Sequence, residues 1–216
     1  LATSAGMTGY INRMQSESLA SYPISVTSVA VDLNSLQNGV NSRGERGEKV
    51  ADDDIVILAG DFSWAMKLED VVPDFNWLTT LKGTKIIIRG NHDYWWHSVS
   101  KVRAVLPENV YALQNDAIKI GNYIFCGNRG WLIPEGKNKT DENDKIYARE
   151  LIRLDLSLKS AQAMRTDNEQ IIYITHYPPF NNKVEPNEFT KMIENAGVSI
   201  CVFAHLHGYI NPNMMY

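Results

Sequence analysis

Metal-capable side chains come directly after four apolar runs of the sequence. Gly60-Asp61 follows residues 55–59 (IVILA), and Gly90-Asn91-His92-Asp93 follows residues 85–89 (KIIIR). His176 follows residues 171–175 (IIYIT), and His205-Leu206-His207 follows residues 199–204 (SICVFA). In open α/β sheets, ligands bind beyond the carboxyl ends of the strands. If the four runs are strands of one sheet, these side chains share one rim.

The mixture of side chains indicates the kind of metal. Imidazole, carboxylate and amide oxygen suit first-row transition metals such as Mn, Fe, Zn, Co or Ni. The set offers no thiolate, which excludes a structural zinc ribbon. Asp61 can bridge two ions through its two oxygens, and two ions about 4 Å apart form a clamp for in-line displacement at phosphorus. His92 is the candidate acid for the leaving oxygen, with Asp93 beside it to orient the ring.

The apolar runs predict the elements that position these groups. Each is a short run typical of a buried strand, and residues 117–120 and 123–126 flank the hairpin dipeptide Gly121-Asn122. A further strand is expected over 24–31, followed by a polar loop over 34–49. Helical spacing of apolar residues is expected over 74–81, 98–106, 141–165 and 188–196. Strands that alternate with helices predict the α/β class.

Composition bounds the protein class. The chain has 216 residues, of which 44% are hydrophobic and 21% charged, as in a globular protein. The net charge of -4 disfavours a general nucleic-acid binder. No apolar run is long enough to span a membrane, and the N-terminus lacks the pattern of a signal peptide. Cys126 and Cys201 lie in apolar runs, as buried thiols of a reducing compartment do, so we expect a cytoplasmic protein without a membrane partner.

Taken together, the motif series resembles that of the calcineurin-like metallophosphoesterases, from about Val50 to Gly208. Ser63-Trp64-Ala65-Met66 and Tyr94-Trp95-Trp96 resemble a bacterial branch of that family. The resemblance implies a four-layer αββα sandwich of two mixed β-sheets flanked by helices. It also implies two divalent or trivalent transition-metal ions, manganese among them, in a dinuclear centre.

The resemblance assigns roles to individual residues. It implies that Asp61 bridges the two metals, and that Asn91, His176 and His205 complete one metal site. His207 would ligate the other metal, and His92 would contact the scissile phosphate as the acid, with Asp93 behind it. The implied activity is hydrolysis of phosphate mono- or diesters by a hydroxide that the two metals activate.

One family element is missing as written. The family opens with Asp-x-His, but no histidine precedes His92 in this chain. Asp32-Leu33-Asn34 is the nearest stand-in, with Asp32 in the role of the first aspartate. The alternative is that residues 1–49 are not family sequence, through a reading-frame error or a truncated gene. We therefore expect an atypical or poorly ordered segment over 1–49 and a phosphoesterase domain over 50–216 that is truncated at its C-terminus.

Several interpretations remain open from the sequence. An incomplete first metal site would make the chain an impaired enzyme that acts as a binding or scaffold module, and metal stoichiometry distinguishes the two. Arg129 either grips a phosphate or forms a surface salt bridge. The tryptophans near the motifs (Trp64, Trp95 and Trp96) either line a substrate cleft or pack in the core. His97 is expected to be a surface or packing residue rather than a ligand, and the sequence leaves the oligomeric state open.

Overall fold

The computed structural model describes residues 50–166, 168–181 and 185–206, and all of these belong to the compact unit Val50–Tyr216. Asp32, His207 and the strand expected over 24–31 lie outside the described residues. The predictions for residues 1–49 and for the C-terminal end of the domain therefore stay predictions.

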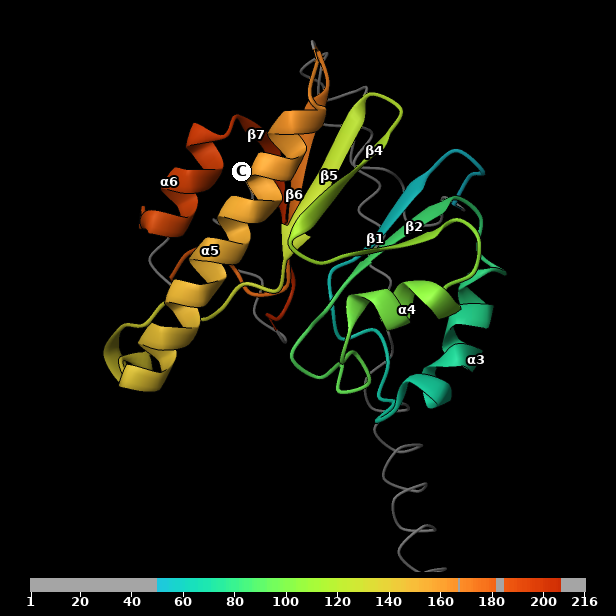
Figure 1. Cartoon of the computed structure of the whole chain (residues 1–216), viewed down its shortest axis with the longest axis horizontal. Coiled ribbons are helices and arrows are strands. Elements are labelled where there is room, and N and C mark those ends of the chain that lie inside the picture. The colour runs from blue at the N-terminus through green and yellow to red at the C-terminus, as the bar shows by residue number, and fades with distance from the viewer. Residues whose placement is uncertain (1–49, 167, 182–184, 207–216) are drawn as a thin grey trace, which may run out of the picture. The chain divides into compact units, whose positions relative to one another are not determined.

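Two β-sheets form the centre of this unit (Figure 1). The first has the order β1-β2-β3, and both of its strand pairs are parallel. The second has the order β4-β5-β6-β7, in which β4 is antiparallel to β5 and the other pairs are parallel. The strands are β1 (Ile55–Leu58), β2 (Thr84–Ile88), β3 (Val110–Leu113), β4 (Asp116–Ile120), β5 (Tyr123–Asn128), β6 (Gln170–Thr175) and β7 (Val198–Val202).

Each sheet carries its own pair of helices. The helices α3 (Leu68–Leu78) and α4 (Val99–Val105) pack on the first sheet, in a cluster that includes Ile87 of β2. The helices α5 (Asp141–Met164) and α6 (Glu188–Asn195) pack on the second sheet, in a cluster that includes Tyr173 of β6 (Figure 1).

The other face of each sheet is buried as well. Along β2, Ile86 and Ile88 alternate with Ile87 and are equally inaccessible, and along β6 Ile172 and Ile174 alternate in the same way with Tyr173. Because successive side chains of a strand point to opposite faces, both sheets are covered on both sides. β3 also contacts β4 and β5 of the other sheet. The expected four-layer αββα sandwich is thereby confirmed.

α3 begins earlier in the sequence than the spacing predicts. The helix was expected to start after Pro73, but it begins at Leu68 and contains Pro73. Val71, Phe75 and Leu78 are all fully buried on one face, at spacings of four and three. The burial of Val71 favours this extra turn although Pro73 donates no backbone hydrogen bond. The hydroxyls of Thr79 and Thr80 bond back to helix carbonyls and end the helix before residue 81.

Two further elements depend on contacts that the sequence pattern does not reveal. β3 was not expected, and it forms through parallel pairing with β2, from Lys85↔Val110 to Ile88↔Leu113. On α5, the expected apolar stripe is joined by the fully buried Glu150. This carboxylate accepts hydrogen bonds from Asn128 Nδ2 at 2.7 Å and Arg153 Nη1 at 2.5 Å. It thus fastens the helix to the end of β5.

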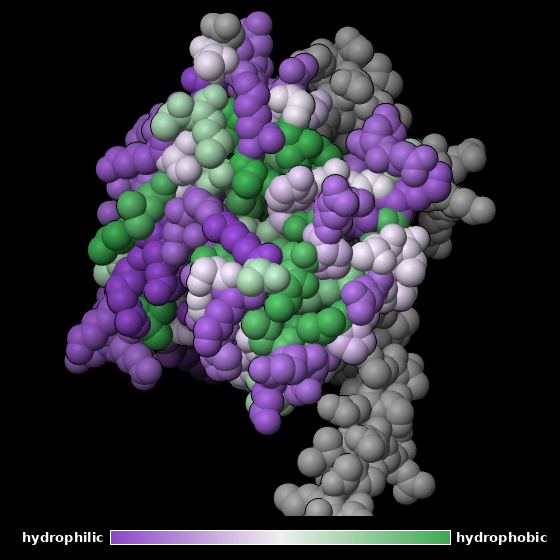
Figure 2. Space-filling view, turned by 45° about the vertical axis from the view of Figure 1, so that its right-hand side comes forward, coloured by the Kyte–Doolittle hydropathy of each residue, from purple (hydrophilic) through white to green (hydrophobic). Residues whose placement is uncertain are grey.

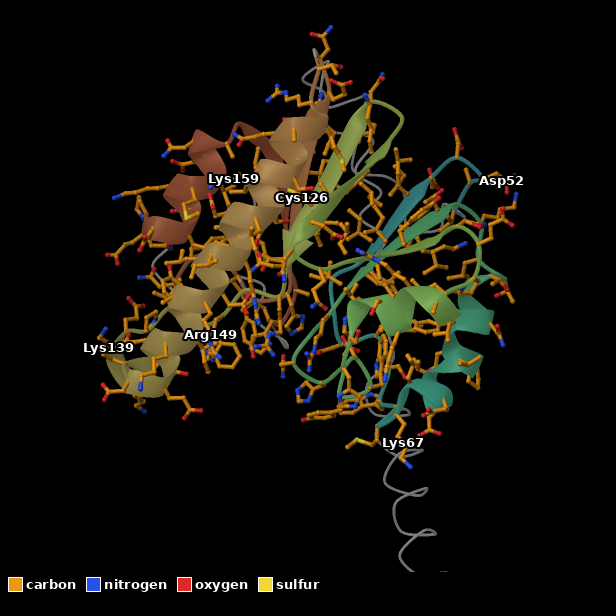
Figure 3. All side chains as sticks on the ribbon, in the orientation of Figure 1. Asp52, Lys67, Cys126, Lys139, Arg149 and Lys159 are labelled. Carbon is orange, nitrogen blue, oxygen red and sulfur yellow. The ribbon has the colours of Figure 1, made fainter. Side chains whose placement is uncertain are left out.

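The molecular surface carries many hydrophilic side chains, and the two cysteines are free thiols. Figure 2 shows hydrophilic side chains over much of the visible face, with hydrophobic residues in smaller areas between them. Within the described ranges, none of the helices has the length and apolar character needed to cross a membrane. Cys126, under α5 (Figure 3), and Cys201 are unpaired, and burial raises the pKa of both thiols to about 12. Both therefore stay protonated at neutral pH.

The stripe on α3 gives a direct test of its packing. Phe75→Ala should lower the free energy of unfolding by about 3–5 kcal/mol, because it empties a fully buried site between Phe62 and Trp95. Trp77→Ala on the same helix should change it by about 0.5 kcal/mol or less, since Trp77 is 49% exposed. Urea unfolding measures both, and equal losses would contradict this packing.

Candidate metal centre

Two glycines let the turns after β1 and β2 lie against each other. A Cβ on Gly60 would lie 2.7 Å from Gly90 Cα and 2.5 Å from His176 Nδ1. A Cβ on Gly90 would lie 2.1 Å from Asp61 Oδ1. No side chain fits at either position, so the turns approach at backbone distance. Asp61 itself has a positive φ of 57°, which only this tight turn explains.

The carboxylate of Asp93 joins these turns. Its Oδ2 accepts hydrogen bonds from Gly90 N at 2.7 Å and Asp61 N at 2.8 Å. Its Oδ1 accepts from three further N–H groups: Phe62 N at 3.0 Å, Trp95 Nε1 at 3.2 Å and Ser63 N at 3.5 Å. Asp93 is 1% exposed, and burial raises its pKa although the backbone donors oppose that shift.

This arrangement differs from the expected role of Asp93. We expected its carboxylate to orient the His92 ring, but both oxygens are directed to the backbone of the turns and to Trp95. In the described part of the chain, Asp93 makes no hydrogen bond to that ring. The physical reason is that the two turns contain several buried N–H groups without a strand partner. One buried carboxylate can accept hydrogen bonds from all of them.

The backbone fixes the tautomer of His176. Its Nδ1 lies 2.8 Å from Ala59 O, and a carbonyl accepts only from an N–H, so Nδ1 carries the proton. Burial lowers the pKa of His176 below its ordinary value, which favours the neutral ring. A neutral ring that is protonated at Nδ1 presents a lone pair at Nε2.

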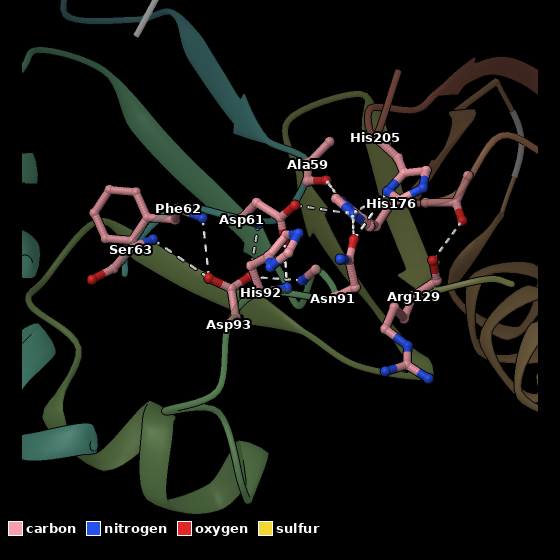
Figure 4. A network of polar contacts seen from close by, with 12 residues as sticks. Ala59, Asp61, Phe62, Ser63, Asn91, His92, Asp93, Arg129, His176 and His205 are labelled. Atoms are coloured by element: carbon pink, nitrogen blue, oxygen red, sulfur yellow. Dashed lines mark hydrogen bonds and ion pairs between the residues drawn. The ribbon is translucent and has the colours of Figure 1, made fainter. Parts of the chain in front are cut away.

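Three further atoms that could bind a metal lie close to this nitrogen (Figure 4). His176 Nε2 lies 2.7 Å from Asn91 Oδ1, 3.2 Å from His205 Nδ1 and 3.4 Å from Asp61 Oδ2. His205 Nδ1 is 3.0 Å from Asn91 Oδ1. Ligands about 2.1 Å from a common ion lie roughly 3.0 Å apart at octahedral angles and 3.4 Å apart at tetrahedral angles. The four measured distances, from 2.7 to 3.4 Å, are close to those between ligands of one ion.

The two oxygens of Asp61 have different surroundings. Oδ1 accepts a hydrogen bond from His92 N at 2.8 Å. Oδ2 is buried and has no hydrogen-bond partner among the residues that the structure describes. An unpartnered carboxylate oxygen that faces the lone pairs of Asn91 and His176 is costly unless a cation lies between them. These residues therefore fit a transition-metal ion, and the protein offers imidazole, amide and carboxylate together.

The second sheet holds the two histidines in place. The backbone carbonyl of Arg129, just after β5, accepts hydrogen bonds from His176 N, Tyr177 N and Thr175 Oγ1. Ala204 N donates to His176 O at 3.1 Å, which brings the end of β7 to the end of β6. The Tyr177 ring packs on His205 at 4.2 Å between ring centroids, and His205 has a positive φ of 67°.

The ring of His92 stands beside this cluster without joining it. Its centroid lies 5.5 Å from that of Trp64 and 6.1 Å from that of Tyr94. Within the described ranges, neither ring nitrogen makes a hydrogen bond. A histidine that contributes its backbone to the Asp61 turn and keeps its ring nitrogens open is suited to proton transfer.

The structure thus brings together Asp61, Asn91, His176 and His205, with His92 adjacent. Arg129 does not join them, because its guanidinium lies over the Trp131 ring, at 4.9 Å from Cζ to the centroid, and points away from the donors in Figure 4. Trp95 and Trp96 are buried core residues, whereas Trp64 is exposed. His97 is exposed, which makes it a surface residue and not a packing one.

Two contributors escaped the sequence analysis. The carbonyl of Ala59 sets the His176 tautomer, and the ring of Tyr177 supports His205. A backbone carbonyl carries no sequence signal of its own. Tyr177 had one, since it directly follows His176 after the strand.

Comparison with protein-family profiles identifies the family of the chain. The sequence profile described as calcineurin-like phosphoesterase matches residues 32–209, which begins at Asp32 and includes His207. This range starts earlier than the Val50 expected from the motifs, and it distinguishes no branch of the family. No individual curated protein matches the chain.

The glycine contact predicts the effect of one added methyl group. Gly90→Ala should weaken Mn²⁺ binding at least about tenfold. The new Cβ would lie 2.1 Å from Asp61 Oδ1 and would therefore push the carboxylate out of place. Gly121→Ala is the matched control, since its Cβ would meet no atom within 4 Å. That variant should lose about 1 kcal/mol of stability through its positive φ and keep its metal affinity. Calorimetric titration measures both, and unchanged binding in Gly90→Ala would contradict the described turn.

Proposed function

The chain belongs to the calcineurin-like phosphoesterase family, and from that premise we propose that it hydrolyses phosphate esters at a metal centre on Asp61, Asn91, His176 and His205. The observation that carries the proposal is the cluster of these four side chains, in which the buried Asp61 Oδ2 lies 3.4 Å from His176 Nε2 and has no hydrogen-bond partner among the described residues. Family membership supplies the reaction class, a metal-dependent phosphoesterase. The residues supply the place where the reaction would occur.

The residues of the chain would divide the work between binding and proton transfer. Bound transition-metal ions would supply positive charge for the phosphoryl oxygens and would acidify water. Asp61 would ligate through Oδ2 while its Oδ1 holds the His92 backbone, at 2.8 Å from Oδ1 to N. His92 would then give a proton from its open ring to the leaving oxygen. Asp93 would fix both residues through the turns rather than through the ring.

A second ion is part of the proposal. His207 and, as a stand-in for the missing histidine element, Asp32 are its proposed ligands. Asp61 would be the ligand that the two ions share, and its Oδ1 also accepts the hydrogen bond from His92 N. Manganese, iron, zinc, cobalt and nickel all suit this donor set. Arg129 remains a proposed phosphate contact, which requires its side chain to rotate off Trp131.

The substrate side is proposed more coarsely. A phosphate monoester or diester is the expected substrate, a cytoplasmic location is the expected setting, and nucleic acid is disfavoured by the acidic net charge of -4. The competing proposal is a non-catalytic binding or scaffold module that holds one ion or none.

Metal content and turnover measured together test the proposal. The Mn-reconstituted chain should bind metal by elemental analysis and hydrolyse p-nitrophenyl phosphate or its bis ester. Asp61→Ala should reduce both metal content and turnover to background, because it removes the bridging ligand. Asp53→Ala should change neither, since that exposed carboxylate lies before β1, at the opposite end of the strand.

The outcomes separate the two proposals. Two ions with turnover support the dinuclear enzyme. One ion or none, without turnover on either ester, contradicts the enzyme and supports the binding module.

His92 has a prediction of its own. His92→Ala should lower kcat by about 10²–10⁴-fold and leave the metal content unchanged, because the ring serves the leaving group and not the ion. His97→Ala, an exposed histidine five positions along the chain, is the control and should keep full activity. Loss of metal in His92→Ala would assign the ring to the metal instead and refute its role as the acid.

A further inference from the structure

We propose that Trp64 and Tyr94 form an aromatic pair that binds a flat aromatic ring on the leaving group of the phosphate ester. The preferred substrates are then esters whose leaving alcohol carries an aryl or nucleobase ring. This inference rests on the proposed function, because it takes His92 as the group that meets the leaving oxygen.

Both rings of the pair lie against the His92 ring. The Trp64 ring is tilted by 40° to His92 at a centroid distance of 5.5 Å, and the Tyr94 ring is edge-on at 6.1 Å. Both distances fall in the range of about 4.5–7 Å in which aromatic rings attract one another. An incoming ring next to His92 would therefore come close to both aromatic side chains.

Both rings are exposed and thus lack the free-energy gain that burial gives a large aromatic side chain. Trp64 is 61% exposed and Tyr94 is 47% exposed, while their neighbours Trp95 and Trp96 are fully buried in the core. Large aromatic side chains normally gain free energy by burial, and exposed ones beside a polar site are typical of binding surfaces. The chain thus leaves open the two aromatic rings that flank the proposed acid and buries the two that do not.

The turn that carries Trp64 is held firmly on either side of that residue. Phe62 stacks on the buried Phe75, and the Ser63 amide donates to Asp93. The Ser63 hydroxyl donates to Asp74 Oδ2 at 2.5 Å and accepts from Ala65 N at 3.1 Å.

The turn that carries Tyr94 is held in the same way. Tyr94 N donates to His92 O at 2.8 Å, and Trp96 Nε1 donates to Gln114 Oε1 at 2.7 Å. Rings on turns that are fixed before the ligand arrives lose little conformational entropy on binding, which favours affinity.

The chemistry of the step determines which part of the substrate meets the pair. The acid must come within hydrogen-bond reach of the oxygen that leaves with its alcohol. The phosphoryl group faces the donor cluster, so the carbon skeleton of the leaving alcohol extends from His92 toward Trp64 and Tyr94. An alkyl chain would gain only area there, whereas a flat ring would also stack.

Four esters in two matched pairs test the inference on the Mn-loaded chain. The first pair is phenyl phosphate and the phosphate of a fluorinated alcohol of the same acidity as phenol. The second pair is adenosine 5′-monophosphate and ribose 5-phosphate. We expect kcat/KM to be higher for the aromatic member of at least one pair.

Trp64→Ala should lower the ratio of kcat/KM for the aromatic ester to that for its non-aromatic partner about tenfold, which corresponds to about 1.4 kcal/mol. Tyr94→Ala should lower it in the same direction.

The controls and outcomes make the test decisive. Trp77→Ala, which removes an exposed tryptophan of α3, should leave the ratio unchanged, and circular dichroism should confirm the fold of each variant. The pair whose ratio falls identifies an aryl or a nucleoside leaving group. Hydrolysis of all four esters with no ratio that depends on Trp64 overturns this inference and leaves the proposed function standing. Hydrolysis of none of the four overturns this inference, and failure on p-nitrophenyl phosphate and its bis ester as well overturns the proposed function.

Discussion

The buried carboxylate of Asp93 is the interaction on which the described site depends. It satisfies N–H groups from the turn after β1 and from the turn after β2, which otherwise would lie buried without acceptors. Such a group is expensive to leave unpaired, so the two turns are stable only while they share this acceptor. Gly60 and Gly90 permit the approach, and the carboxylate holds it.

The turns of the first sheet carry two proposed oxygen ligands and the proposed acid His92, and the second sheet carries two imidazoles. Asp61 and Asn91 extend from the joined turns, while His176 and His205 come from the ends of β6 and β7. The Ala59 carbonyl links the sheets, because it fixes the proton of His176 on the side away from the donors. The Nε2 lone pair of His176 then faces Asp61 Oδ2 and Asn91 Oδ1, which is an arrangement that a cation stabilises.

Much of this could be predicted from the sequence, because parallel strands bring their carboxyl ends to one rim. That rule joins Asp61 to Asn91 on the first sheet and His176 to His205 on the second. The four runs were expected in one sheet but lie in two, so only the family resemblance predicted that the two pairs meet at one metal. The rule could not assign the task of Asp93, whose partners are backbone amides that every sequence possesses. β3 and the first turn of α3 were missed for a related reason. Pairing with β2 and burial of Val71 decide them, and both are tertiary effects that override local signals such as Pro73.

The most direct test of the central claim is the position of a bound ion. A crystal of the Mn-loaded protein, measured for anomalous scattering, should show a peak about 2.0–2.2 Å from Asp61 Oδ2, Asn91 Oδ1, His176 Nε2 and His205 Nδ1. A peak at these four atoms would establish that the two sheets build a metal centre. An ion bound elsewhere, with Asp61 Oδ2 still unligated, would contradict the account.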